Sequence, residues 1–348
     1  MRSFLKPAAG LTCLFALAVT GCSSSSDGSS DAASPGPQKE STTPSESASS
    51  TPSASSSTTS YAPYVSVTTA ADMDSTGSPT TYNLAFAISS GSTCTPKWNG
   101  TTAIDNSAVK SRISALKTSG ATVRVSFGGA SGKELAETCT SASALAKAYG
   151  EALDAAGSTQ ADFDIEGDTL TDSTSVARRS KAIALLQKER TDLKVSFTLP
   201  VMPSGLDSDS LALLESANDN AVAVSTVNIM TMNYGESYTG DMGDYAITSA
   251  TATHTQLKKV FGLSDAGAWQ GMALTSMIGV NDVSGETFSL SDAGQVRAFA
   301  EEKKIAWVSM WSTFRDQQCE SGSSDDDAAT DCSGVTQTAG AFGEAFAG

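Results

Sequence analysis

Apolar and polar residues alternate along a short stretch near the middle of the sequence, residues 161–167. Successive side chains of a strand point to opposite faces. One face would then carry three apolar residues and the other three acidic residues: Ala161, Phe163 and Ile165 against Asp162, Asp164 and Glu166. Three like charges this close cannot all ionise freely, so we expect at least one raised pKa. A raised carboxyl pKa suits a general acid near neutral pH.

Similar patterns predict an alternation of strands and helices from residue 61 onward. The other expected strands are 64–67, 82–88, 123–127, 194–199, 224–232, 271–275 and 306–311. Helical spacing predicts helices near 109–116, 144–156, 173–189, 211–216, 250–260 and 291–304, and a last one around Phe342 and Phe346. Ser143 and Ser291 are the expected N-caps of two of these helices. The first helix is weak, because the chain between Val67 and Tyr82 is mostly small and polar.

Eight strands alternating with helices over residues 61–348 predict a single α/β domain, a (β/α)8 barrel. The alternative is a doubly wound open sheet. No Gly-x-Gly-x-x-Gly follows the first strand, which counts against a dinucleotide-binding fold. Active sites of such barrels lie at the C-terminal ends of the strands. Glu166, Gly128, Gly129, Tyr234 and Trp311 all fall at such ends.

The N-terminal 60 residues have a different composition. Residues 1–21 have a basic start and then a short apolar run, as in an export signal. Val19-Thr20-Gly21-Cys22 is typical of a bacterial lipoprotein site, so we expect cleavage before Cys22 and lipid attachment to it. Residues 22–60 are rich in Ser, Thr and Pro and predict a flexible linker. The expected location is the outer face of the cell membrane, with possible release.

Charge and cysteine content narrow the functional classes. The formal net charge of −16 repels phosphate backbones, so a nucleic-acid partner is not expected. Four cysteines remain besides Cys13 of the leader and the lipid site Cys22, and among three possible pairings we favour Cys94–Cys139 and Cys319–Cys332. His254 is the single histidine, expected on the surface near a helix start. No metal site of the thiolate and imidazole kind, and no cofactor, is expected.

The order of motifs resembles that of glycoside hydrolase family 18, the chitinase family, over about residues 61–348. Residues 162–166, Asp-Phe-Asp-Ile-Glu, resemble the end of the family signature Asp-x-x-Asp-x-Asp-x-Glu. Residues 126–129, Ser-Phe-Gly-Gly, resemble its Ser-x-Gly-Gly motif. Residues 271–279 and 309–316 fit its seventh strand and the end of its eighth.

The resemblance implies a retaining, substrate-assisted mechanism, an exception to the scheme with two catalytic carboxylates. Glu166 would be the acid and then the base. Asp164 would hold the acetamido N–H, and Asp162 would hydrogen-bond Asp164 and share its proton. Gly128 and Gly129 would bind substrate, and Trp311 would lie under the reacting sugar. The expected partner is chitin or another N-acetylglucosamine glycan, and we expect a monomer.

Two positions depart from the family pattern. The first Asp of the signature falls on Thr159, which we expect deep in the strand with only a structural effect. The sixth strand ends in Met230-Thr231-Met232-Asn233-Tyr234-Gly235. Matching the family tyrosine to Tyr234 is favoured, so that Tyr234 donates to the acetamido carbonyl. The other alignment puts Met232 and Asn233 at the tyrosine and aspartate positions.

Only about fifteen residues, 276–290, follow the seventh strand, which predicts an open groove and an internal cut. Two other functions remain open. One is an endo-β-N-acetylglucosaminidase acting on N-glycans, and the other is a chitin-binding lectin without turnover.

Overall fold

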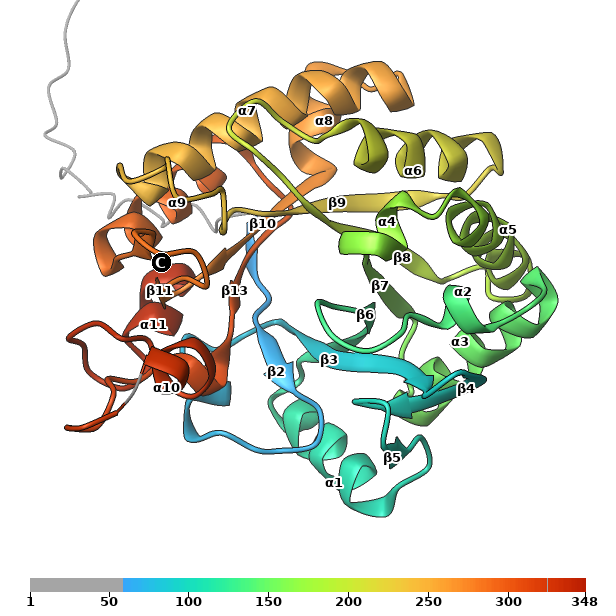
Figure 1. Cartoon of the computed structure of the whole chain (residues 1–348), viewed down its shortest axis with the longest axis horizontal. Coiled ribbons are helices and arrows are strands. Elements are labelled where there is room, and N and C mark those ends of the chain that lie inside the picture. The colour runs from blue at the N-terminus through green and yellow to red at the C-terminus, as the bar shows by residue number, and fades with distance from the viewer. Residues whose placement is uncertain (1–58, 324) are drawn as a thin grey trace, which may run out of the picture. The chain divides into compact units, whose positions relative to one another are not determined.

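The computed structural model describes residues 59–323 and 325–348 (Figure 1). The expected leader 1–21, the lipid site Cys22 and all but the last two residues of the linker 22–60 lie outside the described residues. No helix in the described ranges combines the length and apolar character needed to cross a membrane.

Eight parallel strands surround a common centre, with helices outside them (Figure 1). The strands are β2 (Tyr64–Ser66), β3 (Thr81–Ser90), β6 (Thr122–Gly128), β7 (Gln160–Asp164), β8 (Lys194–Pro200), β9 (Val224–Met230), β10 (Met272–Met277) and β13 (Trp307–Trp311). Each pairs in parallel with the next in this order. The expected α/β fold is therefore confirmed, with eight parallel strands in the sequential order expected for a barrel.

The hydrogen-bonded ladders do not form a complete ring. Within the described ranges no ladder joins β2 to β13. A short strand, β1 (Ser60–Tyr61), pairs with β13, and β2 follows it after two residues and pairs with β3. The N–H of Ala62 also donates to the carbonyl of Val308 at 2.9 Å. The segment 60–66 therefore joins the two ends of the sheet in place of a continuous ladder.

The longer helices lie outside the strands and bury apolar residues toward them (Figure 1). The longer ones are α1 (Ser107–Leu116), α3 (Ala142–Ala156), α5 (Ser173–Glu189), α6 (Ser208–Asp219), α7 (Met242–Phe261), α9 (Leu290–Lys303) and α11 (Ala341–Ala347). The shorter ones are α2 (Leu135–Thr138), α4 (Gly167–Thr171), α8 (Asp265–Gln270) and α10 (Asp325–Thr330). Between β2 and β3 there is only a 3-10 turn, η1 (Asp72–Ser75), as the weak pattern there indicated.

The remaining elements are short strands and turns: β4 (Thr93–Trp98), β5 (Thr102–Ala103), β11 (Gly279–Val280), β12 (Thr287–Phe288), η2 (Lys117–Ser119) and η3 (Thr313–Arg315). Two expected caps lie two residues too late. Ser141 and Ser289 cap α3 and α9, through bonds from the N–H groups of Ala144 and Asp292.

Strand alternation separates an apolar outer face from a polar inner face. Phe127, Phe163 and Phe197 lie on neighbouring strands, with ring centroids 5.3 and 5.6 Å apart, and are fully buried. Tyr149 of α3 packs on the first two of these rings. Because this face is covered by helices, the alternate residues of the same strands point into the centre, and these carry the carboxylates.

Two cysteine pairings are confirmed and one histidine prediction is wrong. Disulfides join Cys94 to Cys139 and Cys319 to Cys332. His254 was expected on the surface, but α7 starts at Met242, which places His254 inside the helix and only 7% exposed. Its ring stacks on Trp269 at 4.0 Å.

Candidate active site

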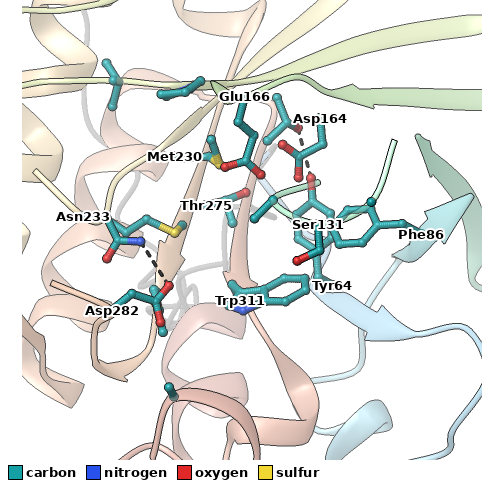
Figure 2. Close-up of a pocket in the computed structure, with 18 of the residues that line it drawn as sticks. Tyr64, Phe86, Ser131, Asp164, Glu166, Met230, Asn233, Thr275, Asp282 and Trp311 are labelled. Atoms are coloured by element: carbon teal, nitrogen blue, oxygen red, sulfur yellow. Dashed lines mark hydrogen bonds between the residues drawn. The ribbon is translucent and has the colours of Figure 1, made fainter. Parts of the chain in front are cut away.

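A pocket of about 830 Å³ opens at the C-terminal ends of the strands (Figure 2). Its wall includes the last or nearly last residues of five strands: Asp164, Pro200, Met230, Met277 and Trp311. Parallel strands bring their C-terminal ends to one rim, and active sites of barrel enzymes lie there. The position expected for the site is therefore where the structure has its pocket.

Asp162 lies below this pocket and is buried. Four hydroxyl groups donate to its carboxylate: Tyr64 and Ser126 to Oδ2 at 2.9 and 2.7 Å, and Ser196 and Thr198 to Oδ1 at 2.7 and 2.8 Å. The donors come from β2, β6 and β8, so the carboxylate ties three other strands to β7. Each oxygen already accepts two hydrogen bonds.

Asp164 and Glu166 form a coupled pair above Asp162, which we call the acidic pair. Burial raises the pKa of Asp164 well above its usual value, and repulsion from Glu166 and Asp162 adds to this. Burial also raises the pKa of Glu166, a hydrogen bond with Asp164 lowers it, and the charge of Asp282 raises it. Two such carboxyl groups titrate as a unit and share a proton.

This geometry corrects one expected hydrogen bond. Asp164 was expected to share a proton with Asp162, but the described hydrogen bonds of Asp162 all come from hydroxyl groups. Asp164 pairs with Glu166 instead. The Oδ1 atom of Asp164 is buried without a hydrogen-bond partner. Asp164 also lines the pocket, so a ligand bound there can supply the missing donor.

Trp311 forms the aromatic floor of the pocket (Figure 2). Its ring stacks against Phe86 with centroids 5.6 Å apart and meets the edge of Tyr64 at 5.9 Å. Two neighbouring aromatic rings restrict the indole to one orientation, which leaves part of it facing the pocket. An exposed indole face suits the apolar C–H surface of a sugar.

Gly128 and Gly129 have a different role from the one expected. Neither is among the residues that line the pocket, although residues 130–132 are. A Cβ on Gly128 would lie 2.0 Å from the carbonyl oxygen of Asp164, and one on Gly129 would lie 2.8 Å from the Phe86 ring. The N–H of Gly129 donates to that same carbonyl at 2.9 Å. These glycines therefore permit close packing beside the acidic pair.

The preferred alignment of the sixth strand is contradicted. Tyr234 is 4% exposed, and its hydroxyl lies 3.5 Å from that of Ser249 on α7, outside the pocket wall. Met232 and Asn233 line the pocket instead. The reason is that β9 ends at Met230 and Asn233 has a φ of 55°, so the alternation stops before Tyr234.

Thr159 also differs from its expectation. It is exposed and precedes β7, so it does not lie deep in the strand. Its carbonyl accepts from the N–H of Lys194, which pairs the start of β7 with β8. This side chain is far along the strand from the acidic pair, and we assign it no role in the site.

The pocket also contains residues that the sequence did not single out. Asp207 and Asp282 line it with the acidic pair, so its four charged lining residues are all acidic. Asp282 lies in a loop without any periodic pattern, and no sequence signal pointed to it. Within the described ranges no cluster of three or more His, Cys, Asp or Glu residues could hold a metal ion.

The known proteins to which this chain is similar are named as chitinases. No family model matches the sequence. The chain is 33% identical over 275 residues to a probable bifunctional chitinase/lysozyme of Escherichia coli, covering 74% of this chain and 31% of that protein. It is 33% identical over 276 residues to endochitinase 11 of Metarhizium anisopliae, covering 74% of this chain and 52% of that protein. The chain thus spans about a third to a half of these relatives.

A solved structure is similar over most of both chains. The catalytic domain of a hyperthermophilic chitinase from Pyrococcus furiosus superposes with a TM-score of 0.73 at 29% identity, covering 82% of this chain and 93% of that one. In sequence and in fold this chain is therefore similar to known chitinases.

Proposed function

We propose that this protein is a chitinase that hydrolyses β-1,4 bonds between N-acetylglucosamine units by a retaining, substrate-assisted mechanism. The observation that carries the proposal is the acidic pair beside Trp311 in one pocket. The similarity to chitinases supports it, including structures of a Pyrococcus furiosus chitinase described as complexed with chito-oligosaccharides.

In the first step Glu166 donates its proton to the leaving glycosidic oxygen. The acetamido carbonyl of the same sugar attacks the anomeric carbon as the C–O bond breaks, which gives an oxazolinium ion. In the second step Glu166 takes a proton from water, and the water oxygen adds to the anomeric carbon from the leaving-group side. The bond from that carbon to the acetamido oxygen breaks as it does so, which regenerates the acetamido group. Two inversions give retention. The raised pKa of Glu166 favours the protonated form that the first step needs.

Asp164 would bind the acetamido N–H through its buried Oδ1, which has no other partner. This bond orients the acetamido group for attack and stabilises the positive charge that develops on it. The hydrogen bond within the acidic pair raises the pKa of Asp164 and lowers that of Glu166, so the shared proton lies on Asp164 before substrate binds. Binding of the acetamido N–H to Asp164 favours its ionised form and moves that proton to Glu166. Asp162 holds this arrangement from below, because four hydroxyl groups fix its carboxylate.

Asn233 is the candidate donor to the acetamido carbonyl, in place of Tyr234. Its side chain is exposed in the pocket wall, and one of its amide hydrogens is directed to Asp282 at 3.3 Å. A primary amide carries a second hydrogen. That hydrogen can donate to the acetamido oxygen.

An internal cut in the polymer fits the short segment after β10. It carries only the two-residue strands β11 and β12 before α9 begins at Leu290. No additional subdomain covers the pocket on that side in the described ranges. We therefore propose an open groove and an endo mode of action.

The relatives give one specific reason to test a second substrate, since the name of the Escherichia coli protein includes lysozyme activity. The experiment incubates the full-length protein with chitin hexasaccharide, peptidoglycan and a high-mannose glycoprotein, beside Glu166→Gln. We expect β-anomeric products from the hexasaccharide and a loss of roughly 10²-fold or more in the variant. Cleavage of only another substrate would replace the proposal. Binding of the hexasaccharide without cleavage would favour a lectin.

We further propose export, lipid attachment at Cys22 and a monomeric state. Two disulfides support export, because such bonds persist in oxidising compartments. Labelling of cells with a radioactive fatty acid should mark the wild-type protein and not Cys22→Ser. Light scattering on the purified protein would measure the oligomeric state, and a dimer mass would contradict the proposal.

A further inference from the structure

A third carboxylate, Asp282, faces the acidic pair across the pocket. It follows β11 and lines the same pocket as Glu166. Figure 2 shows Asn233 and Asp282 together on one side, Asp164 on the other, and the carboxyl group of Glu166 between them in this view. The mechanism above gives Asp282 no role.

The loop that carries Asp282 is held from several directions. Asn233 donates to Oδ2 of Asp282 at 3.3 Å. The buried guanidinium of Arg315 donates to the carbonyl of Val280 at 2.8 Å. The side chain of Asn281 donates to the carbonyl groups of Met277 and Gly279, at 2.8 and 3.0 Å. Although Asp282 is exposed, its backbone is fixed relative to the ends of β10 and β13.

The partner of Asp282, Asn233, is itself held in place by the buried carboxylate of Glu286. Glu286 is 1% exposed, and the N–H of Gly235 donates to it at 2.8 Å. The N–H groups of Asn233 and Tyr234 also interact with this carboxylate. The turn that contains Asn233 is thereby held on the loop that carries Asp282. Together Glu286, Asn233 and Asp282 form one unit, which we call the acidic brace.

The charges around Glu166 come from a small set of groups. Asp164 on β7 and Asp282 on the opposite loop are the acidic groups that act on the pKa of Glu166. Tyr64 and Asp207 are the other titratable residues of the pocket wall. Burial lowers the pKa of the Arg315 guanidinium to about 10, and the charge of Asp282 opposes this. Asp282 therefore interacts electrostatically both with a buried cation, Arg315, and with the acid, Glu166.

We propose that Asp282 is a positioning residue for the reaction: held by the acidic brace, its charge keeps the proton on Glu166 until the leaving oxygen takes it. A negative charge at a fixed position disfavours a second one beside it. Removing it makes Glu166 ionise more easily. This inference rests on the proposed function, because it concerns the acid of that reaction.

The test compares pH profiles of kcat and kcat/KM on chitin hexasaccharide for the wild type, Asp282→Asn and Asp282→Glu. We expect Asp282→Asn to shift the alkaline limb toward lower pH, with several-fold lower activity there and an acidic plateau close to that of the wild type. Asn retains an oxygen that accepts from Asn233. Asp282→Glu keeps the charge, so the alkaline limb of its pH profile should lie closer to that of the wild type. At about 1 M salt the shift should shrink, because Asp282 is exposed and the Debye length falls to about 3 Å.

Asp207→Asn is the matched control, since it removes another carboxylate from the same pocket wall. Asp207 caps α6 by accepting from the N–H of Ser210, and Asn caps helices equally well. Its alkaline limb should stay with that of the wild type. The inference is overturned if the Asp282→Asn profile superimposes on the wild type, or if Asp282→Asn and Asp282→Glu shift equally. A wild-type protein that cleaves nothing would instead overturn the proposed function and this inference with it.

Discussion

The hydroxyl of Tyr64 donates a 2.9 Å hydrogen bond to Oδ2 of Asp162 across 98 positions of the sequence. Tyr64→Phe removes this bond, together with the 3.0 Å bond between the same hydroxyl and that of Thr198, and leaves the ring in place. Hydrogen bonds to charged groups contribute about 1.5–3 kcal/mol, so we expect a loss of this size in the free energy of unfolding. Urea denaturation measures it. Tyr61→Phe is the control, because the hydroxyl of Tyr61 is buried without a partner. Equal effects of the two changes would contradict the assignment.

The raised pKa of Asp164 predicts a stability that depends on pH. Below the ordinary Asp pKa of about 3.9, both states are protonated and there is no penalty. As the pH rises above it, the unfolded chain releases this proton first, so the folded state loses stability relative to it. Asp164→Asn does not titrate. We therefore expect it to raise Tm by roughly 2 °C or more at neutral pH and to lose this gain near pH 4. Calorimetry at both pH values checks this, and a constant difference would contradict it.

The position of Trp311 in the pocket floor predicts that its substitution weakens substrate binding. Trp311→Ala removes the aromatic floor, and we expect kcat/KM on chito-oligosaccharides to fall by roughly 10- to 100-fold, mainly through KM. Trp311→Phe should retain part of the effect. Trp269→Phe, which alters a ring stacked on His254 away from the pocket, should leave KM unchanged. Steady-state kinetics decide, and an unchanged KM in Trp311→Ala would exclude the aromatic floor as a sugar-binding surface.

Gly128 predicts a steric effect on both stability and activity. Its φ is +100°, and an added Cβ would lie 2.0 Å from the carbonyl oxygen of Asp164. Gly128→Ala should therefore destabilise the fold by about 3 kcal/mol or more and lower kcat by displacing the acidic pair. Gly120→Ala has a similar φ of +87° but no atom within 4 Å of the added Cβ, and it should cost only about 1 kcal/mol. Similar losses in the two variants would show that packing against Asp164 is not the cause.

The sequence was a good guide where the chain is regularly extended. Strand alternation placed Asp162 and Asp164 on the inner face and Phe163 on the outer face, and the structure agrees. The eight strands follow from apolar runs, which the helices bury on the outer side. How the two ends of the sheet are joined was harder to predict from the sequence, because it depends on how the short segment 60–66 pairs on its two sides.

The site was predictable only as far as that regularity extends. Tyr234 was misplaced because the positive φ at Asn233 turns the chain after β9 ends. His254 was misplaced because the start of α7, near Met242, carries no strong apolar period. Asp282 was missed because its position depends on contacts with Asn233 and Arg315 that only the folded chain brings together.

The segment 60–66 is the seam of the sheet, and it follows directly after the expected linker. Under the proposed lipid attachment at Cys22, this sets a boundary for proteolytic release of the domain. A protease that cuts before residue 59 would leave the seam intact and would release the domain with its pocket complete. A cut just after Ser66 would leave β3 and β13 each with an unpaired edge, and such edges promote aggregation. Shedding and inactivation would then be separated by fewer than ten residues of the chain.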